Sequence, residues 1–532
     1  MASLVHELTL LQEREGWLGE EGLRGLAERL RLPLHRLESV STFYSHFQRS
    51  EPKAARVDVC RDLSCWLAGA SAARARLGDA LAGRDDVEVR QVSCLGRCDG
   101  APAAVIGHCV VRLDRSEDVV GAIEGRGVAA DAPPAASWGE AEVYEREEDR
   151  YGALRAALAG EPLSLARVLE QAGLRGMGGA GFPTGRKWSV VAREPAEPKY
   201  VICNADESEP GSFKDREVLR DLPHLVLEGM ALAAFCVGAE RGWVFIRHEY
   251  EPERRALEAA IARAYAAGVL GESVLGSGFR FDVEVFVSPG GYILGEETAL
   301  LECMEDRRGE PRNKPPYPAT AGLWNRPTLV NNVETFAHAT AILRRGVGWW
   351  QALGKPGFAG HKFLSVSGDV AEPGVVLVPF GTSLGELLER CGGMRDGRRL
   401  AAVAPGGASS NFLPSHRLDV PIDFQTLEAA GSMLGSGGAV FVAEGRDLLE
   451  VGLSVARFFR NESCGKCVPC RLGSEKAVKR VEAKGGVSEE THELLQELHR
   501  TLVRTSLCGL GQVALAPLLS LLAEFPDTIR PG

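Results

Sequence analysis

The chain has 532 residues, 45% of them hydrophobic and 25% charged, and this length exceeds what one ordinary core holds, so several domains are expected. Its 61 basic and 72 acidic residues give a net charge of −11 and form no basic tail or stripe, which argues against nucleic acid as a partner. No apolar run reaches the roughly 18 residues of a membrane-spanning helix, and no leader peptide is expected at the N-terminus.

The first 128 residues are predicted to form a helical segment and a small α/β layer. Residues 1–50 carry apolar side chains three or four apart, with a break at Pro33, which predicts two helices there. Over residues 51–128, strands are expected at 57–60 and 87–92, and two extended segments around Gly107. Residues 129–150, with two adjacent prolines and a charge run, are the expected linker.

A larger α/β region is predicted over residues 151–350. Apolar runs at 200–203, 242–246 and 283–287 alternate with helical stretches at 225–235 and 253–267, which indicates a largely parallel sheet covered by helices. Residues 351–430 are rich in glycine and proline and are expected to form a compact α+β module with one helix at 384–391. Residues 431–532 are predicted to be helical around a cysteine cluster.

Eight of the thirteen cysteines fall into two spaced groups, one toward each end of the chain. The other five are scattered singly: Cys109, Cys203, Cys236, Cys303 and Cys391. In a chain without a signal peptide, spaced cysteines indicate metal ligands before disulfides. We therefore predict two metal sites and a reducing cytoplasmic location.

The C-terminal group consists of Cys464, Cys467 and Cys470, followed after 37 intervening residues by Cys508. Three close thiolates and one distant thiolate suit a [4Fe–4S] cluster, because each of its irons needs one thiolate. A zinc site and spare buried cysteines are the alternatives. Zinc sites more often use two separated pairs, so we favour the cluster.

The N-terminal group consists of the pair Cys60 and Cys65 and the pair Cys94 and Cys98. Two pairs suit a [2Fe–2S] cluster, in which each iron takes two thiolates, but spacing alone leaves zinc open. The flanking segments 42–47 (TFYSHF) and 94–102 (CLGRCDGAP) resemble the thioredoxin-like [2Fe–2S] ferredoxin subunit that accompanies the NADH-oxidising flavoprotein of respiratory complex I. This resemblance covers about residues 5–125 and implies a [2Fe–2S] cluster.

Four polar segments are candidates for a nucleotide site. Residues 174–188 carry five glycines within a ten-residue span and Lys187, a combination that can surround a phosphate but can equally be a structural loop. The acidic segment 203–216 and the segment 291–298 each follow an apolar strand, where α/β folds place ligands. The segment 331–335 adds two adjacent amides.

These four segments, together with residues 314–318 (KPPYP) and the C-terminal cysteines, resemble the NADH-oxidising FMN subunit of complex I and its soluble relatives over about residues 150–530. The whole chain therefore resembles a fusion of the ferredoxin and flavin subunits. The implied fold is a multidomain α/β chain: an N-terminal helical segment plus a thioredoxin-like [2Fe–2S] domain, a Rossmann-like α/β FMN domain, a small α+β ubiquitin-like (SLBB) domain and a C-terminal helical [4Fe–4S] domain.

The resemblance also implies binding roles for FMN and NAD(H), and it implies no catalytic acid or base. The expected FMN residues are Gly176, Gly178 and Lys187 at the phosphate; Asn204, Asp206 and Glu207 at the ribityl chain and ring edge; Tyr292, Gly295, Glu296 and Thr298 along the flavin; and Asn331 and Asn332 near the phosphate. NAD(H) is expected to stack between Phe182 and Tyr317 and to bond with Glu209 and Glu297.

The implied function is that of an NAD(H)-oxidising (diaphorase) subunit that passes electrons between NAD(H), FMN and the iron–sulfur clusters. Three parents fit: a cytoplasmic formate dehydrogenase whose large subunit holds molybdopterin and iron–sulfur clusters, an NAD-reducing hydrogenase, and complex I. Residues 406–414 and 185–188 look closer to the soluble branch, and we favour formate dehydrogenase. A non-catalytic iron–sulfur or zinc scaffold is the alternative of another class; the joint presence of Lys187, Asn204, Asp206 and the pair Glu296-Glu297 argues against it.

Overall fold

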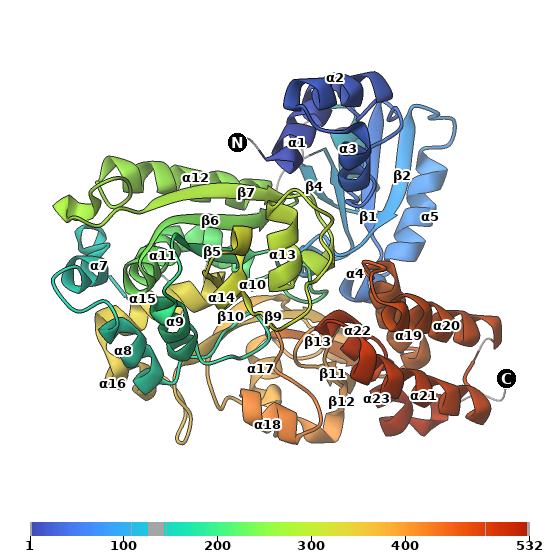
Figure 1. Ribbon diagram of the computed structural model, residues 1–532. Coiled ribbons are helices and arrows are strands. Elements are labelled where there is room, and N and C mark those ends of the chain that lie inside the picture. Colours follow the sequence, from blue (N-terminus) through green and yellow to red (C-terminus); the bar gives the residue numbers. More distant parts are fainter. Residues whose placement is uncertain (1–2, 108, 126–142, 145, 485, 529–532) are drawn as a thin grey trace.

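Four regions follow one another in the computed structural model, which describes residues 3–107, 109–125, 143–144, 146–484 and 486–528. In Figure 1 the N-terminal helices and the first sheet lie beside the larger α/β region, with the C-terminal helices below the first sheet. Of the predicted linker, residues 129–142 and 145 lie outside the described part. Tyr144 is buried and its hydroxyl donates to Glu228, so the end of that segment packs into the α/β region.

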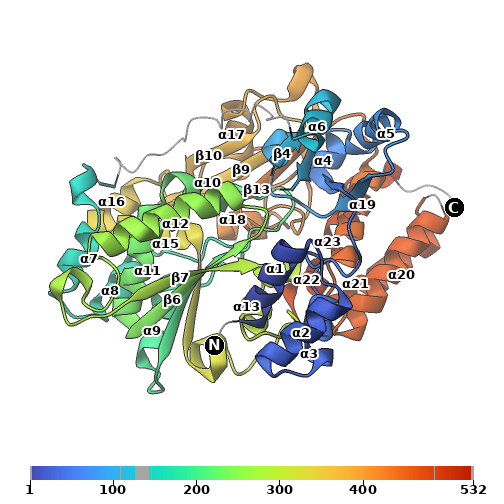
Figure 2. The same cartoon turned by 90° about the horizontal axis from the view of Figure 1, so that it is seen from above.

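The N-terminal region holds three helices: α1 (Leu4–Glu15), α2 (Glu20–Leu30) and α3 (Leu34–Ser41). The predicted break at Pro33 is confirmed, because α2 ends before it and α3 starts after it. The predicted number of two helices is wrong, because a further break at Gly16, which is left-handed (φ 81°), separates α1 from α2. Hydrogen bonds fix these helices to the segment after α13 (Glu297–Met304): the hydroxyl of Ser3 donates to Asp306 (2.6 Å), and that of Tyr44 donates to the Arg307 carbonyl (2.6 Å). Figure 2 shows α1 beside α13 and the end of β7 (Asp282–Ser288).

The first sheet has the order β2–β1–β3–β4. Its elements are β1 (Ala55–Cys60), α4 (Leu63–Leu67), α5 (Ala70–Ala80), β2 (Val87–Val92), β3 (Ala103–Ile106), β4 (Cys109–Arg112) and α6 (Ser116–Ile123). β1 pairs parallel with β2 and antiparallel with β3, and all four predicted extended segments are present. Val57, Val59, Leu77 and Val111 form its core, and Cys60 ends β1.

The larger α/β region contains a four-stranded sheet in the order β7–β6–β5–β8, in which every pair of neighbours is parallel. Its further strands are β5 (Lys199–Ala205), β6 (Ala239–Arg247) and β8 (Thr328–Asn332). Its further helices are α7 (Gly152–Ala157), α8 (Ser164–Ala172), α9 (Thr184–Arg193), α10 (Lys214–Asp221), α11 (Pro223–Val237), α12 (Glu251–Ala266), α14 (Pro318–Ala321), α15 (Val333–Arg345) and α16 (Val347–Ala352).

Both faces of this sheet are buried. Val201 and Cys203 belong to the core that includes α11 and α15, whereas Ile202 and Phe245 belong to a second core shared with the N-terminal helices and α13. Burial on both faces explains why the strands are continuous apolar runs rather than alternating ones. The predicted parallel sheet is confirmed, and β8 is an additional strand.

The third region is a five-stranded sheet in the order β10–β9–β13–β11–β12. Its elements are β9 (His361–Gly368), β10 (Gly374–Pro379), α17 (Leu384–Arg390), β11 (Leu400–Ala404), β12 (Leu413–Pro414), α18 (Phe424–Ala429) and β13 (Gly438–Ala443). The predicted helix at 384–391 is confirmed as α17, which starts with a capping box formed by Ser383 and Glu386. The helix α18 was not expected.

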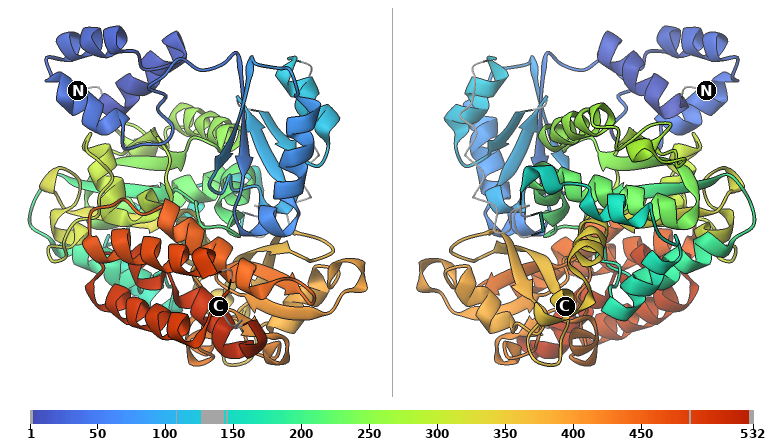
Figure 3. Two further views of the ribbon diagram at one scale, coloured as in Figure 1. Left: turned by 90° about the vertical axis from the view of Figure 1, so that its right-hand side faces the viewer. Right: turned by 90° about the vertical axis from the view of Figure 1, so that its left-hand side faces the viewer.

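The C-terminal region is helical: α19 (Leu448–Asn461), α20 (Val468–Lys484), α21 (Glu489–Thr505), α22 (Gly509–Val513) and α23 (Ala516–Glu524). The Asp447 carboxylate caps α19 by accepting from the backbone N–H groups of Leu449 and Glu450. Figure 3 shows these helices next to the third region, below the N-terminal half. In the part of the chain that the structure describes, no helix combines the length and apolarity needed to cross a membrane.

Candidate functional site

The carboxyl ends of four parallel strands meet at one edge of the larger sheet, where α/β folds bind ligands. This edge brings together segments that lie far apart in the sequence: 204–209 after β5, 288–298 after β7, and Asn331 and Asn332 at the end of β8. The side-chain amide of Asn204 donates to the Gly295 carbonyl (2.9 Å), which joins the first of these segments to the second.

The glycine-rich loop connects α8 to α9 and packs on the end of β8. It is closed by the N–H of Gly176, which donates to the Phe182 carbonyl (2.9 Å). A Cβ atom on Gly178 would lie 2.9 Å from the Cβ of Asn332, so the loop can approach the strand only with glycine there. The loop leads directly into the N-terminus of α9, so its backbone N–H groups and the helix dipole suit a phosphate.

Lys187 projects from α9 toward the same edge. Its ammonium donates to the carboxylate of Glu297 (3.1 Å) and to the carbonyl of Val330 (2.8 Å). Lys314 lies 3.7 Å from the other oxygen of Glu297. Burial raises the pKa of Glu297, but these two ammonium groups outweigh it and hold that pKa below its ordinary value.

Two carboxyl groups after β5 are buried and accept their hydrogen bonds from uncharged donors. Asp206 accepts from the hydroxyls of Ser208 and Ser288 (2.8 Å for Ser288), and burial raises its pKa to about 6. Glu209 accepts from the backbone N–H of Ser409 (2.6 Å), and burial likewise raises its pKa. Buried carboxyls with raised pKa values at a strand edge are typical of a functional site.

Other implied flavin residues have structural contacts. Glu207 accepts from the backbone N–H groups of Asp215 (3.0 Å) and Arg216 (3.2 Å), which caps α10; burial and the Asp215 charge raise its pKa to about 7. Glu296 accepts from the N–H groups of Thr298 and Ala299 (both 2.9 Å) and so caps α13. Sequence reasoning could place these carboxylates after strands but missed their capping role.

The two adjacent amides at the end of β8 point to different partners. Asn331 accepts from the indole N–H of Trp188 (3.0 Å). Asn332 caps α15 by accepting from the N–H of Glu334 (3.0 Å), and its amide donates to Asp215 (2.6 Å). The amides therefore join α9, α10 and α15 at the site.

The two aromatic residues expected to hold NAD(H) are both exposed. Phe182 is 46% exposed and Tyr317 is 58% exposed, so a planar ligand can reach either ring. Phe182 precedes α9, Tyr317 precedes α14, and α14 packs against α9. The two rings thus come from neighbouring elements at the mouth of the same edge.

The four N-terminal cysteines are buried and share one site between β1, α4 and the loop after β2. The sulfur atoms of Cys94 and Cys98 are 3.6 Å apart, and the thiols of Cys65 and Cys94 raise the pKa of Cys60 by hydrogen bonding. The N–H groups of Gly96 and Ala103 lie 3.4 Å from the sulfurs of Cys94 and Cys65. Buried thiolates with amide donors fit a [2Fe–2S] cluster.

Of the C-terminal cysteines, Cys464 and Cys467 lie between α19 and α20, Cys470 lies in the first turn of α20, and Cys508 directly precedes α22. Burial raises the pKa of Cys470 to about 11 and that of Cys508 to about 12, and the charge of Cys464 contributes to both increases. This cysteine site adjoins the edge of the larger sheet that carries the expected FMN residues, called the flavin edge below. The Glu296 charge also raises the pKa of Cys508. The Lys466 ammonium donates to the Pro311 carbonyl (2.7 Å). Among the described residues no group of three His, Cys, Asp or Glu side chains is arranged to hold a single metal ion.

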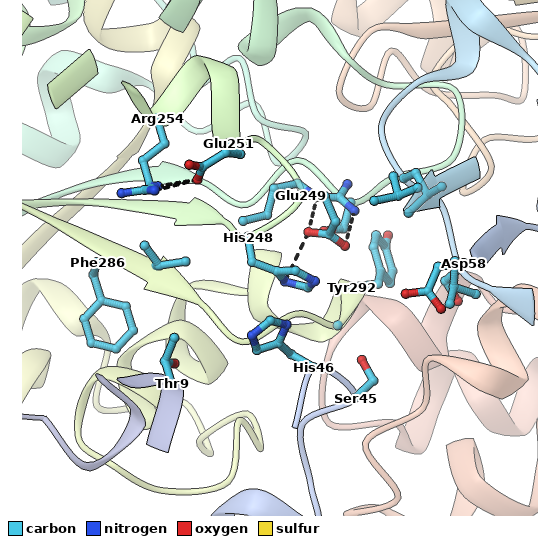
Figure 4. A pocket seen from close by; sticks show the side chains of 18 of the residues that line it. Thr9, Ser45, His46, Asp58, His248, Glu249, Glu251, Arg254, Phe286 and Tyr292 are labelled. Atoms are coloured by element: carbon cyan, nitrogen blue, oxygen red, sulfur yellow. Dashed lines mark hydrogen bonds and ion pairs between the residues drawn. The ribbon is translucent and has the colours of Figure 1, made fainter. Parts of the chain in front are cut away.

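A cavity of about 1370 Å³ lies at the junction of the N-terminal helices, the first sheet, and β6 and β7. Figure 4 shows His46 and His248 in this cavity, with their ring centroids 4.3 Å apart. Cys94 and Tyr292 also line it, so the cavity separates part of the [2Fe–2S] site from the turn after β7. Its lining includes Ser208 and Tyr292, which follow β5 and β7, but no residue of the glycine-rich loop.

The buried Asp206 carboxyl is expected to make stability depend on pH. Its folded pKa of about 6 exceeds the ordinary value, so the folded state binds more protons between about pH 4 and 6, and stability falls as pH rises through this window. For the flavin-free chain, the unfolding free energy of Asp206→Asn relative to wild type should rise by about 2–3 kcal/mol from pH 4 to pH 7. Urea unfolding at both pH values measures this, and a pH-independent difference would contradict it.

Comparison with known proteins assigns each region. Four family profiles match in chain order: "Thioredoxin-like [2Fe-2S] ferredoxin" over residues 1–125, "Nuo51 FMN-binding domain" over 169–341, "SLBB domain" over 363–412, and "NADH-ubiquinone oxidoreductase-F iron-sulfur binding region" over 450–531. These profiles confirm the expected fold classes and both kinds of cluster.

Curated relatives align with the flavin-containing part. An NADH-quinone oxidoreductase subunit of Rhizobium meliloti is 45% identical over 381 residues, which are 70% of this chain and 90% of the relative. The HndC subunit of the NADP-reducing hydrogenase of Solidesulfovibrio fructosivorans is 42% identical over 380 residues, 71% of this chain and 77% of the relative.

A solved structure extends the similarity to the full length. One chain in the crystal structure of the NAD⁺-reducing [NiFe]-hydrogenase in the H₂-reduced state superposes with a TM-score of 0.89 at 30% identity, covering 100% of this chain and 95% of that chain. The chain therefore belongs to the family of NADH-oxidising flavin and iron–sulfur subunits found in NADH-quinone oxidoreductases, here fused to a [2Fe–2S] ferredoxin domain, and its cofactors are FMN, NAD(H), one [2Fe–2S] cluster and one [4Fe–4S] cluster.

Proposed function

We propose that this NADH-oxidising diaphorase subunit works in a cytoplasmic NAD-dependent formate dehydrogenase, beside a large catalytic subunit that holds molybdopterin and iron–sulfur clusters. The segment 406–414 supports this proposal. Its sequence resembles that of the soluble formate dehydrogenase and hydrogenase branch of the family, and it contacts Glu209 of the proposed NAD(H) site. The N–H of Gly406 donates to the Ser410 hydroxyl (3.0 Å), and the N–H of Ser409 donates to Glu209 (2.6 Å). The residues that distinguish the branch thus contact the proposed NAD(H) site.

An NAD-reducing hydrogenase is the second candidate parent. It is favoured by the full-length superposition on a chain of the NAD⁺-reducing [NiFe]-hydrogenase. Complex I is the third: the NADH-quinone oxidoreductase relatives from Rhizobium meliloti and Escherichia coli align with 70% and 73% of this chain. In each case another subunit would bind the second substrate.

The glycine-rich loop and the N-terminus of α9 would hold the FMN phosphate, with Gly176, Gly178 and Lys187 at the contact. The backbone N–H groups at the start of α9 and the nearby ammonium support the assignment. Asn331 and Asn332 would fix the loop from the end of β8, because Asn332 packs on Gly178. This arrangement would orient the phosphate before the ring is bound.

The strand ends would hold the remainder of FMN. Asn204 and Asp206 would bind the ribityl chain, and Tyr292, Gly295 and Thr298 would line the ring. Glu207 and Glu296, whose carboxylates cap α10 and α13, would act by holding these segments in place. FMN held there would supply the conversion between the two-electron hydride chemistry of NAD(H) and the one-electron chemistry of the iron–sulfur clusters.

The NAD(H) pocket would lie between Phe182 and Tyr317. Glu209 and Glu297 would accept hydrogen bonds from polar groups of the dinucleotide. Lys187 and Lys314 keep Glu297 ionised, so it is ready to accept such bonds. The domains are proposed to be 1–50, 51–128, 151–350, 351–430 and 431–532, with 129–150 as the linker. The strand β13 of the last range pairs with β9 and β11 of the range before it, so these two domains share one sheet.

Purification of the native complex tests the choice of parent. A formate dehydrogenase would contain a large subunit with molybdenum or tungsten and reduce NAD⁺ with formate. A nickel-containing partner and hydrogen-dependent NAD⁺ reduction would instead identify a hydrogenase. A chain that binds no FMN and passes no electrons from NADH to viologen would support the non-catalytic scaffold.

Replacing Glu209 with alanine is expected to weaken NADH binding more than FMN binding. The variant removes the acceptor for Ser409 and a carboxylate at the proposed NAD(H) site, so the KM for NADH should rise about tenfold, which corresponds to roughly 1.4 kcal/mol. FMN content should remain near that of the wild type. Glu209→Gln keeps the oxygen that accepts from Ser409, so its KM for NADH should lie between those of the wild type and Glu209→Ala. Equal losses of NADH binding and FMN binding would contradict the proposed role of Glu209.

A further inference from the structure

The loop that carries Cys94 and Cys98 is fixed to the flavin-containing region by a buried arginine. Arg247, the last residue of β6, is 2% exposed. One of its terminal nitrogens donates to the Glu207 carbonyl (2.6 Å), and the other donates to the Cys94 carbonyl (2.6 Å). A single guanidinium therefore bridges a ligand of the [2Fe–2S] site and the residue next to Asp206.

The charge of Arg247 is balanced locally. Its Nε donates to Glu249 (3.0 Å), and a terminal nitrogen lies 2.7 Å from the other oxygen of that carboxylate. The pair is buried, where charges interact more strongly than in water. Removal of the arginine alone would therefore leave a negative charge close to the cluster.

A second arginine limits movement of the same loop. Arg216 donates to the Gly96 carbonyl (2.7 Å) and to Asp99 (2.7 Å). Gly96 also lies so close to Tyr250 that a Cβ would be 2.4 Å from the phenol oxygen. These contacts hold Gly96 and Asp99 without Arg247, so loss of Arg247 need not unfold the loop, whereas Cys94 loses its own hydrogen bond to the end of β6.

We propose that Arg247 is a positioning residue that sets the reduction potential of the [2Fe–2S] cluster and fixes the cluster relative to the flavin. This inference rests on the proposed flavin contacts of Asp206. The planar guanidinium makes four hydrogen bonds here, two to carbonyls and two to one carboxylate, which is one more than the three donors of a lysine allow. Net charge and hydrogen bonds around a cluster are the factors by which a protein changes its potential.

The direction of the effect follows from the charges. Reduction of the cluster adds one electron and breaks no bond, so a nearby positive charge favours the reduced form. Arg247→Met removes that charge and leaves Glu249 with only the His248 imidazole beside it (3.3 Å), a ring whose pKa is lowered by burial, and this makes reduction harder. The double variant Arg247→Met/Glu249→Gln removes both charges and should restore the potential, while the two carbonyl hydrogen bonds stay lost.

The experiment is a redox titration of the [2Fe–2S] signal by electron paramagnetic resonance in the intact complex, with dithionite and mediators. Arg247→Met should disfavour the reduced cluster about tenfold, which lowers the midpoint by about 59 mV for one electron. The double variant should return to within about threefold of the wild type. Arg241→Met, which removes an exposed arginine from the same strand, is the control and should leave the midpoint unchanged.

Three results would overturn the proposal: an unchanged midpoint in Arg247→Met, a full shift that persists in the double variant, or the same shift in the Arg241→Met control. If Arg247→Met alone fails to fold, the double variant still tests the proposal. It should show a restored midpoint but slower NADH-driven reduction of the cluster. A wild-type midpoint together with a wild-type reduction rate would contradict the proposal. FMN content and NADH–viologen activity are measured separately. Their absence in the wild type would contradict the proposed function without changing the dithionite titration.

Discussion

Replacing Cys467 with alanine is expected to abolish substrate-linked NAD⁺ reduction in the intact complex while FMN stays bound. Cys467 lies in the loop between α19 and α20, and each iron of a [4Fe–4S] cluster needs its own thiolate. The flavin edge uses different segments, so its residues remain in place. The measurements are FMN fluorescence after release, the iron content of the chain, and NAD⁺ reduction with formate or hydrogen.

Cys109→Ala provides the matched control for this loss. Cys109 starts β4 and belongs to neither cysteine group. This variant should keep the iron content and the activity of the wild type. Unimpaired NAD⁺ reduction by Cys467→Ala, or equal losses in both variants, would contradict the assignment of the C-terminal cluster.

The strands of the larger sheet were predictable where they are continuous apolar runs. β5, β6 and β7 are of this kind, and burial on both faces accounts for their composition. β8 escaped prediction because it is short and ends in Asn331 and Asn332, which are typical of turns. It becomes a strand by pairing with β5, from Tyr200 opposite Thr328 to Asn204 opposite Asn332.

The composition of the site was more predictable than its contacts. Polar residues after strands mark an edge of the sheet, but they do not show which atoms the backbone already uses. Glu207, Glu296 and Asn332 cap helices in the folded chain. The contact between Arg247 and Cys94 could not be predicted from the sequence, because the two residues lie 153 positions apart and meet only after folding.

A buried charged cluster links the flavin-containing region to the third region and should dominate local stability. Glu334, in the first turn of α15, has a fully buried side chain and pairs with Lys362 of β9 and with Lys214 (3.0 Å). It also accepts from the backbone N–H of Phe363 (2.9 Å). Lys362 in turn donates to the carbonyl of Ser436 (3.1 Å), so the pair joins α15 to β9 and to the loop before β13.

Glu334→Ala is expected to lower the free energy of unfolding by about 3–5 kcal/mol, because it leaves a buried ammonium without its carboxylate. Glu334→Ala/Lys362→Met should recover most of this loss, since the double variant buries no uncompensated charge there. The exposed pair Arg241–Glu284 supplies the control, and Glu284→Ala should cost at most about 1 kcal/mol. Urea unfolding of the four chains measures these differences.

The pH dependence gives an independent check on the same cluster. Burial lowers the pKa of Lys362 to about 8, below that of an unfolded lysine. Between these two values the unfolded state binds more protons than the folded state, so stability rises with pH across the window. Glu334 raises the pKa of Lys362, so in Glu334→Ala the folded pKa of Lys362 lies below about 8 and stability already rises with pH there, while that of the wild type does not. The deficit of Glu334→Ala should therefore shrink as pH rises toward about 8 and stay constant above it. A deficit that stays constant or grows as pH rises toward about 8 would mean that the unpaired ammonium is not its cause.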